Sequence, residues 1–378
     1  MDGGRPTVAR IDAAALRANL ATVRERAPKQ AVIAVVKADA YGHGAVRVSQ
    51  VLAAAGVEWL AVLSVAEACV LRDAGIHLPI LILSGVHDAE EAREALAREL
   101  CPVVHHEQGA ELLAQAAARS GAACPVQVEI DTGMRRMGVA PGEARALIER
   151  VAADPALRLA GVFTHLARAD EPDPAPSLEQ VAALAGILAE LRVDPGQVHV
   201  AASAGLLTWP ALAVDAPPTH AVRPGILLYG SNPATHVELE AQPVMTLATR
   251  VVHLRDVAPG DGVGYGAIFR APRRGRIATL AAGYADGVPR CLGEPGRPPA
   301  HVLIGNRRHP VAGRVSMDYL TVFLAAGENG VSIGDEVVLF GRSAGGALLR
   351  VDELAAATGT IAYELLVRVG GRVPRRFV

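Results

Sequence analysis

The stretch AVIAVVKADAYGHG, residues 31–44, joins a short apolar run to a lysine, a tyrosine and two glycines. Apolar runs of this length are typical of strands buried in parallel sheets, so Lys37 is expected where a strand ends. Only Lys29 and Lys37 are lysines among the 37 basic residues of the chain. A guanidinium cannot replace an amine that must lose its proton, so a lysine retained here indicates Schiff-base chemistry with a carbonyl rather than a chance strand-end lysine.

Seven further apolar runs follow this stretch and alternate with amphipathic segments rich in Ala, Leu, Glu and Arg. The eight runs cover residues 32–36, 59–63, 80–83, 101–104, 126–130, 159–164, 198–201 and 220–223. Strands that alternate with helical patterns indicate βαβ units and a parallel sheet. Eight such units fit an α/β fold of the (β/α)₈ TIM-barrel type, and a doubly wound sheet is the structural alternative.

The pattern changes after about residue 235, where strand-like segments are separated by Pro-Gly, Gly-Asp and Arg-Arg-Gly turns. We expect strands near residues 244–253, 275–280, 300–304, 336–340 and 347–351, one helix over 351–358, and a proline-rich loop over 169–177. The predicted domains are therefore a (β/α)₈ barrel over residues 12–235 and a mostly β domain formed by residues 1–11 and 236–378.

Composition narrows the range of functions. The formal net charge is −2 and no long basic run is present, which disfavours nucleic acid or an anionic membrane as a partner. The N-terminus lacks the basic and apolar regions of a signal peptide. Cys69, Cys101, Cys124 and Cys291 are scattered without metal-ligand spacing, so we expect reduced thiols, no metal site and a cytoplasmic location.

Chemically useful side chains stand at the predicted ends of the barrel strands, where barrel enzymes place their active sites. They are Lys37, Tyr41, Asp131, Arg136, His165, Ser203 and Arg223. Backbone N–H groups of Gly225 and Ile226, with the hydroxyls of Tyr41 and Ser203, could hold a phosphate. Each has an ordinary alternative: a core histidine, surface arginines, or a turn glycine.

Taken together, the motifs resemble those of the alanine racemase family, whose members use pyridoxal 5'-phosphate. The resemblance covers about the whole chain. It rests on KADAYGHG (37–44), DTGMxRxG (131–138), FTHLA (163–167), RPGILLYG (223–230), GYGA (264–267), GYADG (283–287), GRVSMD (313–318) and AYE (362–364).

The resemblance implies interconversion of L-alanine and D-alanine, which supplies D-alanine for cell-wall peptidoglycan. Lys37 would carry the cofactor as an aldimine and act as one base, and Tyr265 would act as the other from the partner subunit of a homodimer. Two acid–base groups on opposite faces are what removal and return of the α-proton requires. The remaining implied roles are the histidine of a histidine–arginine chain (His165), the partner of the pyridine nitrogen (Arg223), the residue near the substrate carboxylate (Arg136), phosphate ligands (Tyr41, Ser203, Gly225, Ile226, Tyr363) and residues contributed by the partner subunit (Met317, Asp318).

Three positions depart from the family pattern: Glu129, Ser316 and Ala202. Family members often have at position 129 a lysine whose carbamate holds the active-site arginine. We hypothesise that the Glu129 carboxylate replaces that carbamate, since both end in two oxygens that accept from a guanidinium. The alternative is a strand-end carboxylate that faces solvent or pairs with Arg135.

Three other functions stay open at this point. One is a broad-specificity racemase acting, for example, on serine. A second is a barrel-type pyridoxal-phosphate amino-acid decarboxylase, against which Ser316 and the Tyr265 motif argue. The third is a non-catalytic pyridoxal-phosphate carrier, a class that lacks the β domain.

Overall fold

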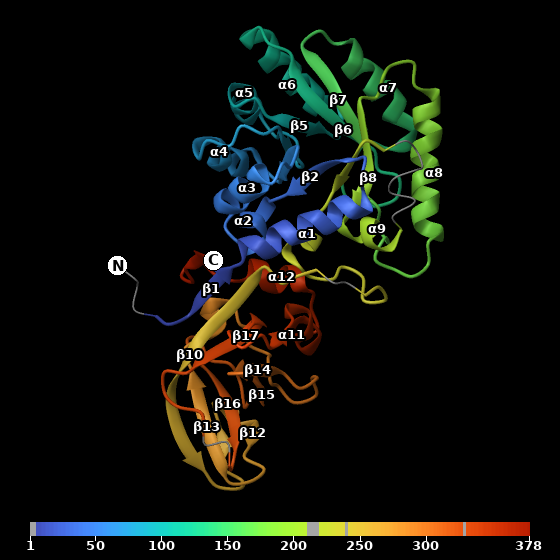
Figure 1. Cartoon of the computed structure of the whole chain (residues 1–378). Coiled ribbons are helices and arrows are strands. Elements are labelled where there is room, and N and C mark those ends of the chain that lie inside the picture. Colours follow the sequence, from blue (N-terminus) through green and yellow to red (C-terminus); the bar gives the residue numbers. More distant parts are fainter. Residues whose placement is uncertain (1–4, 210–218, 239–240, 328–329) are drawn as a thin grey trace.

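The computed structural model describes residues 5–209, 219–238, 241–327 and 330–378. Two lobes are visible in Figure 1: a barrel surrounded by helices, and an elongated lobe made mostly of strands. The predicted combination of a (β/α)₈ barrel with a mostly β domain is confirmed. Residues 1–4 of the expected β domain lie outside the described residues.

The barrel is a closed parallel sheet in which the first strand pairs with the last, Ala31 with Ala221. Its side chains are almost entirely buried, because helices cover the outer face and side chains fill the interior. The strands are β2 (Ala31–Val35), β3 (Trp59–Val62), β4 (Ile80–Ile82), β5 (Cys101–Val104), β6 (Cys124–Glu129), β7 (Leu157–Phe163), β8 (Gln197–Ala202) and β9 (Ala221–Arg223).

Some of the helices between these strands begin at polar caps that the sequence supplies. Ser64 Oγ accepts from the backbone N–H of Glu67 at 3.3 Å, and Asp88 Oδ1 accepts from the N–H groups of Glu90 and Glu91 at 2.8 Å. The helical segments are α1 (Ala13–Arg26), α2 (Lys37–Gly42), α3 (Ala45–Ala54), α4 (Val65–Asp73), α5 (Ala89–Ala97), α6 (Glu107–Ser120), α7 (Pro141–Ala153), α8 (Ala175–Glu190), α9 (Ser203–Thr208) and the 3₁₀ turn η1 (Ile226–Tyr229).

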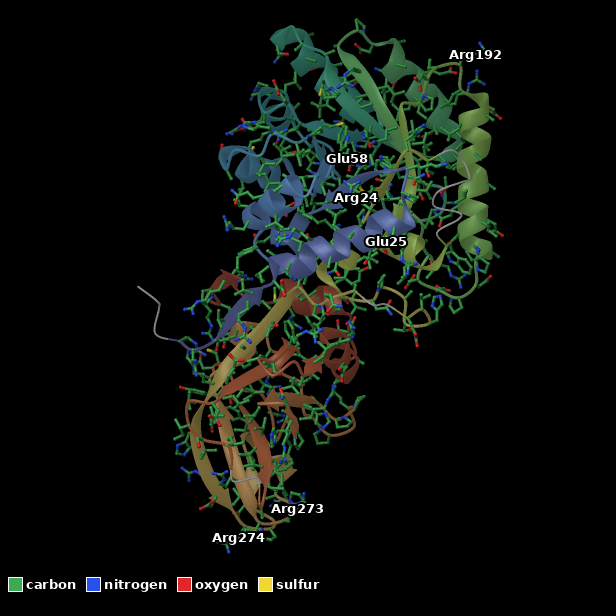
Figure 2. All side chains as sticks on the ribbon, in the orientation of Figure 1. Arg24, Glu25, Glu58, Arg192, Arg273 and Arg274 are labelled. Atoms are coloured by element: carbon green, nitrogen blue, oxygen red, sulfur yellow. The ribbon has the colours of Figure 1, made fainter. Side chains whose placement is uncertain are left out.

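Glu58 joins helix α1 to the first barrel strand. Its carboxylate pairs with Arg24 near the end of α1, at 3.2 Å from Nη2, and accepts from the backbone N–H of Val32 at 2.9 Å (Figure 2). The ion pair is exposed, so its contribution to stability is small, but the backbone hydrogen bond fixes where β2 starts.

The second lobe is built on a nine-stranded sheet within the described residues. The first strand of the chain belongs to it, because β1 (Val8–Ile11) pairs antiparallel with β10 and parallel with β19. The two chain ends therefore meet in this lobe. Its other elements are β10 (Met245–Val257), β11 (Gly262–Val263), η2 (Tyr265–Ala267), β12 (Phe269–Arg270), β13 (Gly275–Leu280), η3 (Tyr284–Asp286), β14 (His301–Ile304), β15 (Arg307–Pro310), β16 (Leu320–Ala325), β17 (Glu336–Arg342), β18 (Leu348–Leu349), α11 (Val351–Thr358), α12 (Ala362–Val367) and β19 (Arg375–Phe377).

Two expectations about local structure are corrected. The loop predicted over 169–177 ends earlier, since α8 begins at Ala175 and includes Pro176 in its first turn, where proline is tolerated because its missing N–H has no partner within the helix. The strand predicted over 244–253 extends to Val257 because it pairs along its length with several neighbouring strands, β1, β13 and β17. None of the described helices is long and apolar enough to cross a membrane.

Candidate active site

A cavity of about 760 Å³ lies at the carboxyl ends of the barrel strands. It brings together residues that are far apart in the sequence, and ten of the predicted site residues line it. These are Lys37, Tyr41, Glu129, Arg136, His165, Ser203, Arg223, Gly225, Ile226 and Tyr363. Four predicted residues do not line it: Asp131, Tyr265, Met317 and Asp318.

Lys37 begins an unusual turn that follows strand β2. Residues Ala38, Asp39, Ala40 and Tyr41 have φ angles of 52–54°, so the chain makes a left-handed turn. Each non-glycine residue in this conformation costs roughly 1–2 kcal/mol. Sequence patterns do not reveal such a turn, because these residue types favour right-handed helix.

Neighbouring groups hold this turn in place. The carboxylate of Glu67 on α4 accepts from the N–H of Ala38 at 2.8 Å and from that of Leu63 at 2.7 Å. Asp39 Oδ1 accepts from the N–H of Ala45 at 2.7 Å. Glu67 therefore links the lysine turn to the end of β3, a role that the sequence analysis missed.

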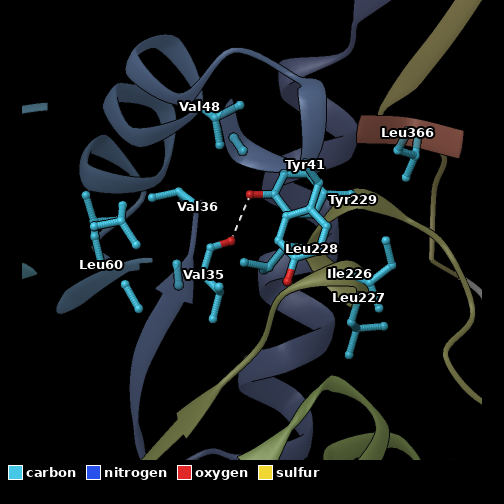
Figure 3. Close-up of a cluster of buried hydrophobic side chains, with 14 of the residues drawn as sticks. Val35, Val36, Tyr41, Val48, Leu60, Ile226, Leu227, Leu228, Tyr229 and Leu366 are labelled. Carbon is cyan, nitrogen blue, oxygen red and sulfur yellow. Dashed lines mark hydrogen bonds between the residues drawn. The ribbon is translucent and has the colours of Figure 1, made fainter. Parts of the chain in front are cut away.

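Aromatic rings support the turn from below (Figure 3). The ring centroids of Tyr41 and Tyr229 lie 4.9 Å apart, and the Tyr229 hydroxyl donates to the Val35 carbonyl at 2.9 Å. At Gly42 a Cβ would lie 2.4 Å from the carbonyl oxygen of Leu366, so only glycine fits there. Helix α12 of the β lobe thus packs directly against the lysine turn.

The electrostatic surroundings of Lys37 favour its neutral amine. Burial lowers the pKa of Lys37, and the nearby charge of Arg136 lowers it further, while Glu67 and Glu129 oppose the shift. A lysine with a lowered pKa is a better nucleophile and base near neutral pH.

Arg223 is fully enclosed and held by an array of acceptors. Its Nη2 donates to the carbonyl oxygens of Thr164 at 2.8 Å and Val200 at 3.2 Å, and its Nη1 bonds His199 Nδ1. Burial lowers the pKa of Arg223 to about 10, so the guanidinium stays charged at neutral pH and only donates.

His199 and Gln127 extend this array into the barrel. Since Arg223 can only donate, His199 Nδ1 must accept, and its Nε2 donates to Gln127 Oε1 at 2.6 Å. Neither residue was predicted from the sequence. A histidine between valines in a strand is most simply explained as a core residue, and only its contact with Arg223 distinguishes it.

His165 lies between Arg223 and the cavity. Its Nδ1 is 3.4 Å from Arg223 Nη2, and burial together with the charges of Arg223 and Arg136 lowers its pKa to about 3. The ring is therefore neutral, and because Nδ1 faces a donor, the proton is on Nε2. His165 thus offers a donor N–H at the cavity.

The same cavity has the polar groups that a phosphate requires. Ser203 Oγ accepts from the N–H groups of Gly225 at 2.8 Å and Leu227 at 3.2 Å. A Cβ on Gly225 would lie 2.4 Å from the Tyr41 hydroxyl, so the glycine lets that hydroxyl approach the backbone. Burial raises the pKa of Tyr41 to about 12 and keeps its hydroxyl protonated as a donor.

Glu129 is buried with 7% of its surface exposed, so the interpretation that it faces solvent is wrong. Arg135 is not its partner, because that guanidinium lies 3.5 Å from Asp131 Oδ2. Instead, Glu129 Oε2 lies 3.3 Å from His105 Nδ1. Burial raises the pKa of Glu129, whereas the charges of Arg223 and Arg136 lower it.

The residues expected to serve a partner subunit lie on the surface of the β lobe. Tyr265 is 67% exposed and Met317 is 54% exposed. Tyr265 lies in turn η2 directly before β12, which Figure 1 shows well away from the barrel.

Comparison with known protein families shows which family the chain belongs to. A model of the alanine racemase N-terminal domain matches residues 11–233, and a model of the alanine racemase C-terminal domain matches residues 244–377. The chain belongs to the alanine racemase family. The alanine racemase of Acidithiobacillus ferrooxidans is 42% identical over 380 residues, which cover 99% of each chain.

Solved structures of alanine racemases have the same fold. The biosynthetic alanine racemase from Pseudomonas aeruginosa superposes with a TM-score of 0.88 at 39% identity and covers 99% of both chains. The alanine racemase from a D-cycloserine-producing Streptomyces lavendulae gives a TM-score of 0.90 at 34% identity and covers 100% of this chain and 98% of its own.

Proposed function

We propose that this member of the alanine racemase family interconverts L-alanine and D-alanine with pyridoxal 5'-phosphate, and so supplies D-alanine for cell-wall peptidoglycan. The observation that carries the proposal is Lys37: an amine with a lowered pKa at the mouth of the barrel, in one cavity with Arg136, Arg223 and a set of phosphate-type donors. Barrel enzymes place catalytic groups at this end of the strands.

The donor set fits the proposed cofactor. Lys37 would bind it covalently, and Tyr41, Ser203, Gly225, Ile226 and Tyr363 would hold its phosphate through hydroxyl and backbone N–H groups. The fixed guanidinium of Arg223 would face the pyridine nitrogen. Because the Arg223 guanidinium keeps all its protons at neutral pH, it would donate a hydrogen bond to the pyridine nitrogen without protonating it. The ring would then be a weaker electron sink, which limits side reactions.

When bound, the cofactor acidifies the α-proton of the amino acid attached to it. The residues of the chain then move that proton. Lys37 Nζ would exchange it on one face, since the lowered pKa of the amine lets it accept and return a proton near neutral pH. Arg136, at the rim of the cavity, would hold the substrate carboxylate by a bidentate pair and fix which face is presented to each base.

Tyr265 of the partner subunit would exchange the proton on the other face. The exposure of Tyr265 and its absence from the cavity of its own chain support a shared site in a homodimer. The Nε2–H of neutral His165 would donate to the tyrosine oxygen and favour its phenolate form. Met317 and Asp318 would join the substrate pocket from the same partner.

We also propose that Glu129 supplies the negative charge that the family's carbamylated lysine supplies elsewhere. Burial raises the pKa of Glu129, and the charges of Arg223, Arg136 and Lys37 oppose that shift and favour the anionic form.

The free cysteines of the described chain support a reducing, cytoplasmic location.

Racemisation of a panel of amino acids, with and without added pyridoxal phosphate, tests the proposed racemase activity directly. We expect alanine to be the preferred substrate and serine to be weaker. Preference for serine or a basic amino acid, or carbon dioxide release without racemisation, would contradict it.

Covalent labelling tests the role of Lys37. Borohydride reduction should attach a pyridoxyl group to a peptide that contains Lys37, and Lys29 is the only other lysine that could compete. The label on Lys29, or the absence of visible absorbance from a bound cofactor, would exclude the assignment.

A further inference from the structure

Two arginines and two aspartates form a closed cluster on the β lobe. Arg372 donates from Nε to Asp286 Oδ1 at 2.8 Å and from Nη2 to Asp286 Oδ2 at 3.0 Å and Asp318 Oδ1 at 2.9 Å. Arg5 donates to Asp286 Oδ2 at 3.1 Å and to Asp318 Oδ1 at 3.3 Å. We call Arg5, Asp286, Asp318 and Arg372 the arginine clamp. Its charges balance, and each arginine bridges both aspartates.

The clamp fixes two loops against each other: the first covers residues 283–286 and the second covers residues 316–318. The Asp286 side chain is only 1% exposed and also accepts from the N–H of Gly283 at 2.9 Å. The first loop supports the second through backbone bonds, since the N–H groups of Tyr284 and Ala285 donate at 3.0 Å to the carbonyl oxygens of Ser316 and Met317. A Cβ on Gly283 would lie 2.3 Å from the Met317 carbonyl oxygen, so this contact requires glycine.

The clamp also holds the backbone of the second loop. Arg5 Nη2 donates to the main-chain carbonyls of Asp318 and Ala281, both at 3.1 Å. The Met317 side chain stays half exposed while its backbone is held on both sides. An exposed loop is normally mobile, and a residue that must meet a substrate needs a fixed position.

We propose that Arg5 and Arg372 are positioning residues that hold Met317 and Asp318 in the geometry with which they enter the active site of the partner subunit. The inference rests on the proposed shared site. The clamp residues come from both ends of the chain, so the two termini set the substrate pocket of the other subunit rather than that of their own.

The first test compares Michaelis constants in the holoenzyme. Arg372→Gln should raise KM for alanine about tenfold and change kcat much less, since small displacements of a positioning loop weaken substrate binding strongly. Arg372→Lys should lie between wild type and Arg372→Gln, because an ammonium cannot donate to both carboxylates in the same geometry. Arg368→Gln, an exposed arginine paired with Glu364 at 3.1 Å, is the matched control and should keep the wild-type KM.

The second test uses hybrid dimers that carry Lys37→Ala, Tyr265→Phe and Arg372→Gln. The three substitutions are distributed over the two chains in two different ways. Chains with Lys37→Ala and Arg372→Gln, mixed with Tyr265→Phe chains, form one active site that contains the altered clamp. Chains with Tyr265→Phe and Arg372→Gln, mixed with Lys37→Ala chains, form one active site with an intact clamp. We expect a raised KM only in the first mixture.

The results of the two tests distinguish a failure of the proposed clamp from a failure of the proposed shared site. Equal KM values in the two mixtures, or an unchanged KM in Arg372→Gln, would overturn the role of the clamp while leaving racemisation intact. The parent mixture of Lys37→Ala and Tyr265→Phe is the reference. If it is inactive although subunit exchange is verified by mass, the shared site fails, and the action of the clamp across the interface fails with it.

Discussion

At the scale of single residues, the role proposed for Glu129 would change what the active site depends on. A carbamate requires carbon dioxide and a neutral lysine, whereas a glutamate needs neither. Glu129 is buried, faces His105 at 3.3 Å, and lies within the field of Arg136 and Arg223. Its side chain is several bonds shorter than a carbamylated lysine, so contact with Arg136 requires a closer loop, a water or an ion.

Glu129→Gln should lower kcat/KM for alanine by roughly 10- to 150-fold, equivalent to about 1.5–3 kcal/mol for a buried charge-assisted pair. Wild-type activity should not respond to added bicarbonate. The exposed Glu111→Gln is a suitable control. An unchanged rate and Michaelis constant in Glu129→Gln, or activation of the wild type by bicarbonate, would remove this role.

Some residues of the candidate site could be predicted from the sequence, and others could not. The cavity-lining residues Lys37, Arg136 and Arg223 follow strands that apolar runs reveal, and the strand ends of a barrel converge. His199 and Glu67 could not be found in this way. Their roles depend on contacts with Arg223 and with the N–H of Ala38, across 24 and 29 residues of sequence, that no local pattern records.

At the scale of elements, the left-handed turn after Lys37 is the main feature that sequence patterns failed to predict. Alanine-rich segments favour right-handed helix by local propensity. Here tertiary bonds from Glu67 and the contact of Gly42 with α12 override that preference. By contrast, the range predicted for α11 agrees with the structure, because this helix has a regular pattern of buried residues and ends at Gly359 in the left-handed conformation.

The turn can be tested with two alanine-to-glycine changes. Ala38 has a φ of 52° and is exposed, so Ala38→Gly should raise the free energy of unfolding by about 0.5–1 kcal/mol by removing backbone strain. Ala18 is exposed in the right-handed helix α1, and Ala18→Gly should lower it by about 1 kcal/mol. Urea midpoints measure both. A loss of stability in Ala38→Gly equal to that in Ala18→Gly would show that the turn is not strained.

At the scale of the whole molecule, the two lobes are interdependent. Strand β1 belongs to the β lobe but leads directly into helix α1 of the barrel, and α12 packs against the lysine turn. The residues that the barrel cavity lacks, Tyr265 and Met317, lie exposed on the β lobe. We therefore propose that each lobe carries half of an active site and that two copies of the chain complete each other.

The barrel should also be sensitive to acid, because it contains four buried neutral histidines. Burial lowers the pKa of His43 and His105 to about 4, that of His165 to about 3, and that of His199 well below the ordinary value of 6.5. Below pH 6.5 the unfolded chain binds protons at these positions and the folded chain does not. Each histidine should therefore remove about 1.4 kcal/mol of unfolding free energy per pH unit, until the pH nears its folded pKa.

Glu129 acts in the opposite direction, since its raised pKa lets the folded chain bind a proton more readily than the unfolded chain does, but it is one group against four. The slope of the unfolding free energy between pH 6 and 5, measured with urea on the holoenzyme, should correspond to roughly three to four protons taken up on unfolding. Between pH 7.5 and 8 these histidines should contribute almost nothing to the slope of the unfolding free energy with pH. A slope of one proton or fewer near pH 5.5 would mean that the histidines titrate in the folded barrel, and the neutral His165 proposed to assist Tyr265 would then be wrong.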